Sequence, residues 1–281
     1  MFKADMHVHT TASDGVFSPE EAVKWAADKN IDTIAVTDHD TVNGLEEAFE
    51  AGRKYGVNII PGVEMSCLYK EDEVHIVGLF IDYENEDLKK KFKELSEART
   101  KRGAKIAENL RKEGIDISYE EILKEAQCDS VGKPHVARVL VKKGYAEDMD
   151  DAFKKYLVRG KPGDVERKKI TVPEAAELIH NAGGIAIVAH PGIIRHREYA
   201  EEILQYDIDG MEVIHSIHSE ETIKRIQKLV DDRGLLKSAG SDCHGKLIDG
   251  VPMIGDYYLT EEEFNALKKR RDERMKTNGE E

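Results

Sequence analysis

The amino-acid sequence predicts an α/β fold with parallel strands and a reactive mouth at one end of the sheet. Short apolar segments alternate with longer amphipathic segments in the first part of the chain and again after residue 170. Histidine, aspartate or glutamate follows directly after most of the apolar segments. Because the carboxyl ends of parallel strands meet at one face, this pattern is typical of a barrel mouth.

The first part of the chain contains four predicted strands and two predicted helices. Apolar residues among the first eight, Met1 included, predict a short strand that carries His7 and leads to His9. Ser18 and Glu21 fit a capping box at the start of a helix. Further strands are expected at 31–37, 57–60 and 74–81, and helices at 18–30 and 41–55.

The alternation of strands and helices stops between residues 85 and 170. A long, highly charged helix is predicted over 87–113, where Gly114 is its stop and Gly103 is expected to weaken or bend it. Shorter helices are predicted after a second capping box at 118–121, at 133–143 and at 149–157. We expect 85–170 to form an inserted helical subdomain that covers the active site of a domain made of 1–84 and 171–281.

The alternation resumes in the last part of the chain. A helix that ends at Ala182 is followed by Gly183 and Gly184, which stop it. The next predicted strands span 185–189, 210–214 and 235–240, with a helix at 219–232 between the last two. Thr260 and Glu263 predict the cap of a final helix.

Composition excludes several classes of protein. The 281 residues carry a net charge of −14, which argues against an extended nucleic-acid groove and against long duplex partners. Small anionic substrates remain compatible, because bound metal ions supply positive charge locally. The three cysteines, Cys67, Cys128 and Cys243, form no disulfide framework, and no membrane-spanning or leader segment is evident. We therefore expect a cytoplasmic protein without membrane contact.

The residues at the strand ends predict a metal centre. His7 and His9 are two positions apart, so their side chains leave an extended strand on the same face. Six strand segments carry such residues, and surface or core histidines would explain only one or two of them. Imidazole and carboxylate without thiolate suit manganese, zinc or iron, and the set is too large for one tetrahedral ion. We expect two or three divalent ions. The candidate ligands are His7, His9, Asp14, His39, Glu64, His75, His190, Asp242 and His244.

This ordered set of motifs resembles the PHP (polymerase and histidinol phosphatase) family over nearly the whole chain. The resemblance implies a distorted (β/α)7 barrel with a two- or three-metal centre. It also implies how the ligands are shared among the ions. His7, His9, Glu64 and Asp242 would hold one ion, Glu64 with His75 and His190 a second, and Asp14, His39 and His244 a third.

Within the family, the inserted helices and the segment from Gly132 to Arg138 look most like the nucleoside 3′,5′-bisphosphate phosphatases. That branch includes enzymes that trim short RNA from its 5′ end. Many members have arginine where this chain has Lys133, so a basic residue is retained. The resemblance implies that Arg138 and Arg195 contact substrate phosphate, and His135 is a further candidate. Solvated positions on a helix or loop are the alternative for all three.

Asp14, His39 and His218 are the candidate catalytic residues. His218 follows a predicted strand and begins a helix, and it could donate a proton to the leaving group. Asp38 and Asp40 could orient His39, as carboxylates commonly do for metal-bound imidazoles. Helix capping is the alternative for these two aspartates.

The function expected from these residues is hydrolysis of a phosphate monoester by a metal-dependent enzyme. Nucleoside 3′,5′-bisphosphates are the preferred substrates, and short 5′-phosphorylated RNA is a second class. Histidinol phosphate is the rival substrate. A non-catalytic PHP module that serves in protein interaction is the alternative of another kind, and the complete ligand set argues against it.

Overall fold

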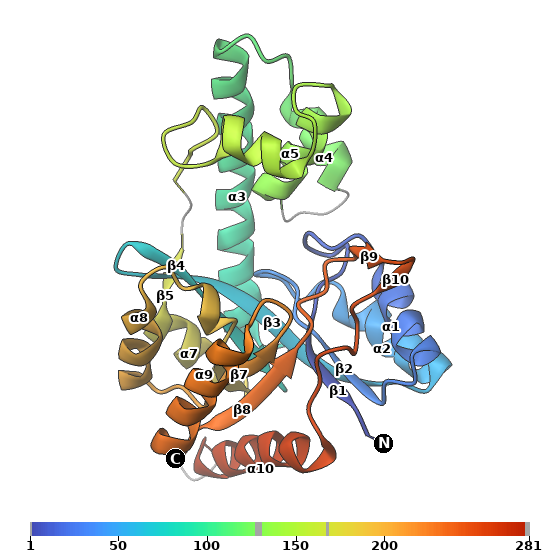
Figure 1. The fold of residues 1–281 in the computed structure, drawn as a ribbon, viewed down its shortest axis with the longest axis vertical. Coiled ribbons are helices and arrows are strands. Elements are labelled where there is room, and N and C mark those ends of the chain that lie inside the picture. The colour runs from blue at the N-terminus through green and yellow to red at the C-terminus, as the bar shows by residue number, and fades with distance from the viewer. Residues whose placement is uncertain (1, 127–130, 167–168, 279–281) are drawn as a thin grey trace.

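The computed structural model describes residues 2–126, 131–166 and 169–278, so Met1 and Cys128 lie outside the described residues. Its centre is a sheet whose seven main strands form a nearly closed barrel (Figure 1). The short β5 (Ile170–Thr171) pairs with β3 outside this path. The main strands, in spatial order, are β1 (Ala4–Val8), β2 (Thr33–Val36), β3 (Asn58–Tyr69), β4 (Asp72–Leu79), β6 (Ile185–Val188), β7 (Gly210–His215) and β8 (Leu236–Gly240).

The first and last strands approach each other closely and nearly close the barrel. Gly240 on β8 makes this approach possible, since a Cβ at this position would lie 2.3 Å from Cβ of His7. The backbone N–H of Asp242 donates to the carbonyl oxygen of His7 at 2.8 Å. Asp5, which is fully buried, accepts a hydrogen bond from the backbone N–H of Ser241 at 2.9 Å. This seam therefore holds the first predicted ligands against the last ones.

The sheet is mixed, which corrects the expectation of parallel strands throughout. β4 runs antiparallel to both β3 and β6, whereas β1 with β2, β2 with β3, β6 with β7 and β7 with β8 are parallel. The reason is the tight connection between β3 and β4, where Tyr69 pairs with Asp72 and only two residues lie between the strands. A connection this short forms a hairpin and is too short for a parallel crossover.

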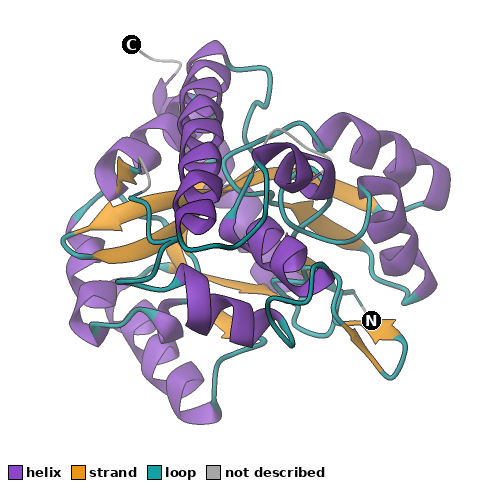
Figure 2. Cartoon of the chain, turned by 90° about the horizontal axis from the view of Figure 1, so that it is seen from above, coloured by secondary structure: helices purple, strands orange, loops and turns teal. Residues whose placement is uncertain are grey.

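Helices flank the barrel strands, as Figure 2 shows. The capping boxes predicted at Ser18 with Glu21 and at Ser118 with Glu121 are both present. The exposed hairpin of β9 (Leu247–Ile248) and β10 (Val251–Pro252) has no counterpart in the sequence-based expectations. The flanking helices are α1 (Pro19–Asp28), α2 (Leu45–Tyr55), α7 (Val172–Asn181), α8 (Arg197–Glu202), α9 (Glu220–Arg233) and α10 (Glu261–Asn278), with short 3₁₀ turns η2 (Pro191–Ile193) and η3 (Ile203–Gln205).

The helix α3 (Glu86–Lys112) belongs to two hydrophobic cores (Figure 1). Leu88 and Phe92 in its first half pack with barrel residues, and Ile106 and Leu110 in its second half pack with the helices that follow. Gly103 lies where α3 meets the next helix, and a Cβ there would come within 2.9 Å of the Tyr119 ring. The following helices are α4 (Tyr119–Ala126), α5 (Lys133–Lys142) and α6 (Met149–Ala152), continued by the π-helical turn η1 (Phe153–Leu157). The division of the chain into a barrel and an inserted subdomain stays a proposal.

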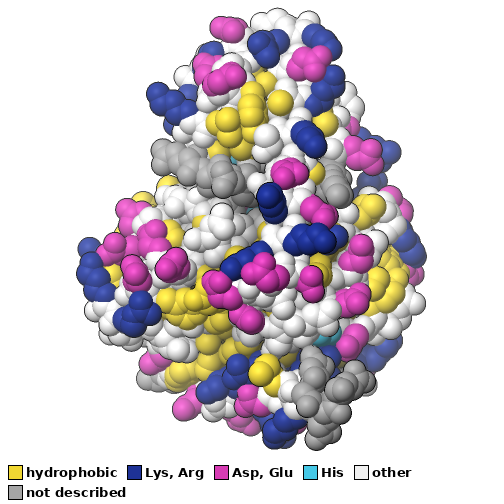
Figure 3. All heavy atoms as spheres, turned by 180° about the vertical axis from the view of Figure 1, so that it is seen from behind, with side chains coloured by type: hydrophobic (Ala, Val, Ile, Leu, Met, Phe, Trp, Pro, Cys, Tyr) yellow, Lys and Arg dark blue, Asp and Glu magenta, His cyan; other side chains and the backbone are white. Residues whose placement is uncertain are grey.

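Charges of both signs are intermingled on the face of the molecule that Figure 3 shows. Lysine and arginine side chains there lie next to aspartate and glutamate side chains, without an extended basic stripe on that face. Within the described residues, none of the helices has both the length and the apolar character that crossing a membrane requires.

A buried carboxylate ties the C-terminal helix to the base of the barrel. Asp209 precedes β7 and is 2% exposed. Its Oδ2 accepts from the backbone N–H of Ala186 at 2.9 Å and lies 2.9 Å from Nε2 of His180. Arg270 and Arg274 of α10 donate to its Oδ1 at 2.8 and 2.7 Å. Burial would raise the pKa of Asp209, but these partners outweigh burial and lower it to about 2.

The depressed pKa of Asp209 predicts a pH-dependent contribution to stability. A carboxylate whose pKa is lower in the folded chain stabilises the fold above its unfolded pKa, and this contribution is lost as the pH falls through the folded pKa. We expect Asp209→Asn to reduce the free energy of unfolding by roughly 2 kcal/mol at pH 6. The difference from the unmodified chain should narrow between about pH 4 and pH 2. Urea unfolding of the metal-free protein across this pH range measures the effect.

Asp116→Asn is the control for this measurement, because the Asp116 side chain is 89% exposed. It should change the unfolding free energy little at any pH. An Asp209→Asn effect that is constant from pH 6 to pH 2 would contradict the assignment.

Candidate metal centre

The barrel mouth gathers all nine predicted ligands from six strand segments. His7 lies in β1 and His9 directly follows it, while His39 and His190 follow β2 and β6. Asp14 comes from the loop after β1, and Asp242 and His244 come from the segment after β8. Glu64 differs from the expectation, because it lies inside β3 and not at its end. β3 is longer than predicted, since it continues into the hairpin with β4.

His75 reaches the mouth because β4 is antiparallel. It lies near the start of its strand, which in a parallel sheet would place it at the opposite end from the other ligands. In the hairpin His75 pairs with Ser66, and its Nδ1 lies 2.7 Å from Oε1 of Glu64. The reversed strand direction therefore brings His75 to the other ligands.

Glu64 is the shared centre of the cluster. Its Oε1 lies 2.7 Å from Nδ1 of His75 and 2.8 Å from Nε2 of His190. Its Oε2 lies within 3.1 to 3.3 Å of ring nitrogens of three further histidines. These are Nε2 of His7, Nε2 of His9 and Nδ1 of His39. One buried carboxylate thus faces five imidazoles, the arrangement required of a bridging ligand.

The inner group consists of His7, His9, Glu64 and Asp242, whose ligand atoms all lie within 4.8 Å of one another. Nε2 of His7 and Nε2 of His9 are 3.0 Å apart, and both face Oδ1 of Asp242 at 3.4 and 3.1 Å. The two histidines and Glu64 are almost fully buried. The same four residues were expected to hold one ion.

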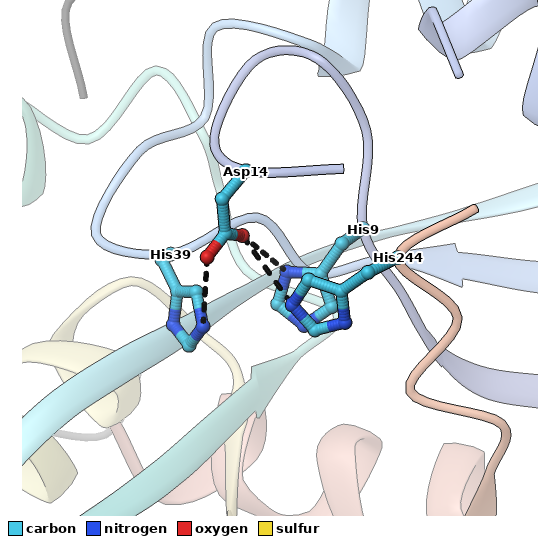
Figure 4. A group of neighbouring side chains, drawn as sticks. All are labelled: His9, Asp14, His39 and His244. Carbon is cyan, nitrogen blue, oxygen red and sulfur yellow. Dashed lines mark ion pairs between the residues drawn. The ribbon is translucent and has the colours of Figure 1, made fainter. Parts of the chain in front are cut away.

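The outer group consists of His9, Asp14, His39 and His244, as Figure 4 shows. Asp14 points between the three imidazoles, with Oδ1 3.3 Å from Nε2 of His244 and 3.8 Å from Nδ1 of His9. Its Oδ2 lies 4.0 Å from Nε2 of His39. His9 therefore takes part in both groups, through Nε2 in the inner group and Nδ1 in the outer one. The spacing of residues in the sequence does not reveal this double role.

The donor set fits divalent metal ions. Among the described residues, Nδ1 of His9, Oε2 of Glu64 and Oδ1 of Asp242 are buried without a hydrogen-bond partner. Buried polar atoms without such a partner are costly, and a bound cation would satisfy these three. A set of imidazoles and carboxylates without thiolate is compatible with manganese, zinc or iron.

The electrostatics of the cluster reflect burial and close charges. Burial lowers the pKa of His39 to about 3 against the opposing effect of Glu64. Burial acts in the same direction on His9, but Asp242 and Glu64 outweigh it and raise its pKa to about 10. Burial would raise the pKa of Glu64, yet the surrounding histidines hold it well below its usual range. The carboxylate therefore stays charged, as a metal ligand requires.

Asp38 and Asp40 stabilise the loops around His39. Asp38 accepts hydrogen bonds from the backbone N–H and the hydroxyl of Thr10 at 2.8 and 2.7 Å, and from the hydroxyl of Ser13 at 2.5 Å. Asp40 accepts from the backbone N–H of Ser66 at 2.9 Å and pairs with Arg99. These bonds join the loop that bears Asp14 and the helix α3 to the end of β2. Their partners were not expected from the sequence.

Three residues at the mouth adopt a left-handed backbone conformation, namely Asp40, His190 and Asp242, with φ of 50°, 29° and 53°. Such conformations are unfavourable for residues other than glycine and are concentrated at functional sites. Two of the three, His190 and Asp242, are predicted ligands. Their left-handed backbone conformation therefore directs the side chains of predicted ligands into the mouth.

The predicted substrate contacts lie in different surroundings. The Arg138 guanidinium, from α5, donates to the backbone carbonyl oxygen of Asp14 at 2.8 Å, which brings it beside the outer group. His135 is 1% exposed, and its Nδ1 accepts from the backbone N–H of Gly132 at 3.0 Å. Burial and the nearby Arg138 lower the pKa of His135 to about 4. Arg195 lies exposed in the segment after η2.

Both ring nitrogens of His218 bond to the backbone. Nδ1 lies 3.0 Å from the carbonyl oxygen of Val213, and Nε2 accepts from the backbone N–H of Gly192 at 3.1 Å. In this arrangement the ring is neutral, with its proton on Nδ1. The proton-donor role suggested by the sequence would require one of these bonds to break.

Sequence reasoning missed two buried acids and one buried base near the cluster. Asp5 lies in the barrel seam, Glu212 lies against His7, and Arg99 pairs with Asp40. All three are less than 7% exposed. A charged residue inside an apolar strand pattern was the available signal for Asp5 and Glu212, whereas Arg99 is one of many charges on α3.

Comparisons with known proteins show the family and the fold of the chain. A family model described as PHP domain matches residues 5–164. The 5′-3′ exoribonuclease Rnm of Salmonella typhimurium is 38% identical over 249 residues, which cover 85% of this chain and 84% of the relative. The 3′,5′-nucleoside bisphosphate phosphatase of Chromobacterium violaceum is 34% identical over 252 residues, which cover 87% of this chain and 88% of the relative. A solved amidohydrolase structure from Chromobacterium violaceum, with bound sulfate and no metal, has a TM-score of 0.84 at 32% identity and covers 95% of this chain and 96% of that one.

The shared position of Glu64 predicts unequal losses of metal on mutation. Glu64→Gln should lower the Mn²⁺ bound per chain more than His244→Ala. Glu64 belongs to the inner group and also lies with His39 and His75 in a third possible metal-holding group, whereas His244 belongs only to the outer group. Metal analysis after equilibrium dialysis of both variants tests this ranking. Equal Mn²⁺ contents in the two variants would argue against a bridging role for Glu64.

Proposed function

Because the chain belongs to the PHP domain family and is a metal-dependent phosphoesterase, we propose that it hydrolyses nucleoside 3′,5′-bisphosphates to nucleoside monophosphate and phosphate. Short RNA with a 5′-phosphate is the second substrate class within this proposal. The support from similarity is that relatives named as a bisphosphate phosphatase and an exoribonuclease each align with more than four fifths of the chain.

The observation that carries the proposal is the position of Arg138 beside the outer ligand group. Its guanidinium donates a hydrogen bond of 2.8 Å to the backbone carbonyl oxygen of Asp14. The side chain of this same Asp14 faces His9, His39 and His244. Guanidinium groups bind phosphate through paired, charge-assisted hydrogen bonds. A phosphorylated substrate at the mouth would thus meet an arginine next to the ligand cluster.

The chain's own residues would bind the metal ions and orient the substrate. Bound divalent ions would supply an activated water and offset the negative charge on the phosphoryl oxygens. Glu64, Asp242 and Asp14 supply the negative charge that would hold the ions in a buried site. Arg138 would orient the substrate phosphate toward this cluster. Lys133, at the start of α5, is a further basic residue of this segment, and its Nζ donates to the backbone carbonyl oxygen of Leu157.

Substrate choice is tested by comparing phosphate release in the presence of Mn²⁺. We expect adenosine 3′,5′-bisphosphate to be hydrolysed with a kcat/KM at least about tenfold above that of histidinol phosphate. The second phosphate group of the bisphosphate can form one extra charge-assisted contact, which contributes about 1.5–3 kcal/mol. A short 5′-phosphorylated RNA forms the third arm of the assay. Preference for histidinol phosphate would overturn the proposed substrate.

Arg138→Ala tests the phosphate contact separately. Loss of a hydrogen bond to a charged group costs about 1.5–3 kcal/mol, so KM should rise about 10- to 100-fold with a smaller change in kcat. Steady-state kinetics with adenosine 3′,5′-bisphosphate measures both constants. Arg111→Ala, on the exposed distal end of α3, is the matched control and should change neither. An unchanged KM in Arg138→Ala would remove Arg138 from the site.

A further inference from the structure

The strand β7 supplies none of the nine predicted ligands, yet it places two buried polar side chains against them. Glu212 is 1% exposed and His215 is 0% exposed. Glu212 contacts His7 and the backbone at His190, and His215 faces Asp242. Two polar groups this deeply buried need partners. Those of Glu212 belong to the metal centre, whereas Nε2 of His215 has no hydrogen-bond partner among the described residues and lies 3.5 Å from Oδ2 of Asp242.

A β-bulge explains how both side chains point into the barrel. Residues three apart on a regular strand point to opposite faces. Glu212 is opposite Ser238 and Ile214 is opposite Ala239, so β7 advances by two residues while β8 advances by one. The extra residue is a bulge, a feature that redirects side chains and is common next to active sites. As a result Glu212 and His215 both lie on the side of the cluster.

Glu212 determines which nitrogen of His7 is available to a metal. Its Oε1 lies 2.8 Å from Nδ1 of His7, and its Oε2 accepts from the backbone N–H of His190 at 2.6 Å. An ionised carboxylate only accepts hydrogen bonds, so Nδ1 of His7 carries a proton. The lone pair of a neutral His7 is then on Nε2, the atom that lies 3.4 Å from Oδ1 of Asp242 and 3.3 Å from Oε2 of Glu64.

His215 holds the other side of the inner group. Its Nδ1 accepts from the backbone N–H of Ile217 at 3.3 Å, so the proton of the neutral ring lies on Nε2. Nε2 is 3.5 Å from Oδ2 of Asp242 and 3.9 Å from Oε2 of Glu212. The ring therefore presents an N–H to the oxygen of Asp242 that faces away from His7 and His9.

We propose that Glu212 and His215 are positioning residues of the inner metal group. Glu212 selects the tautomer of His7 and anchors the backbone at His190, and His215 restrains the carboxylate of Asp242. Partners of this kind orient metal-binding side chains, and their loss typically weakens metal affinity 10- to 100-fold. The proposal concerns metal binding and is independent of which phosphoester is the substrate.

The test is Mn²⁺ affinity of the metal-free protein, measured by calorimetric titration. Glu212→Gln keeps the size of the side chain, but its amide can accept from only one of the two N–H groups while its NH₂ faces the other. We expect Mn²⁺ to bind about 10- to 100-fold more weakly. Asp209→Asn is the matched control, because Asp209 is also a buried carboxylate beside β7 but bonds to His180, Arg270 and Arg274 at the barrel base.

Asp209→Asn should lower stability and leave Mn²⁺ affinity unchanged, so the two readouts separate positioning from folding. Equal Mn²⁺ affinity in Glu212→Gln and the unmodified chain would overturn the proposal for Glu212. A pair of His215 variants keeps the test decisive if Glu212→Gln does not fold. His215→Phe should weaken Mn²⁺ binding, and His215→Gln, which retains an N–H donor, should restore part of it.

The same titration distinguishes positioning from direct ligation. His7, Glu212 and His215 are themselves close enough to hold an ion. Loss of one whole equivalent of Mn²⁺ in His215→Phe, with the affinity of the remaining ions unchanged, would overturn the proposal in favour of a ligand role. A lower affinity at unchanged stoichiometry supports positioning.

Discussion

The barrel mouth depends on one constraint, which is that the buried carboxylate of Glu64 must be shared by five imidazoles from four strand segments. Each oxygen of Glu64 lies within 3.3 Å of at least two ring nitrogens. A buried charge is costly unless opposite charges or hydrogen bonds surround it. The strands that carry these histidines must therefore approach one point, and the hairpin of β3 and β4 and the seam between β1 and β8 are the features that achieve this.

The loops at the mouth and the helix α3 are coupled to this cluster by a smaller set of charges. Asp38 holds the loop that carries Asp14, and Asp40 pairs with Arg99 of α3. Because α3 packs with the barrel in its first half and with the helical segment in its second, this pair connects both cores to the edge of the site. Arg138 reaches the Asp14 loop from the helical segment. The proposed substrate contact and the ligand cluster therefore share one loop.

The side of the mouth formed by β7 has a different role from the others. The other strands around it bring candidate ligands, whereas β7 brings Glu212 and His215 behind them. The bulge between Glu212 and Ile214 makes this possible, because it turns Glu212 and His215, which are three positions apart, toward the same side of the strand. On this proposal, metal affinity would depend on two layers of side chains, the candidate ligands and the groups that hold them.

The sequence by itself predicted the family, which the comparisons confirm, and most helices, since periodicity, capping boxes and ordered motifs are local signals. It also singled out the nine candidate ligands that the structure gathers at the barrel mouth. The 27-residue helix α3 was predicted within one residue at each end, and the capping boxes at Ser18 and Ser118 were predicted correctly. The direction of β4, the double role of His9 and the bulge in β7 were decided only by the tertiary structure. Strand direction, register and shared ligands arise from pairing between distant segments, so no local pattern encodes them. Glu212 was overlooked for this reason, because its function lies in a hydrogen bond to a residue 205 positions away.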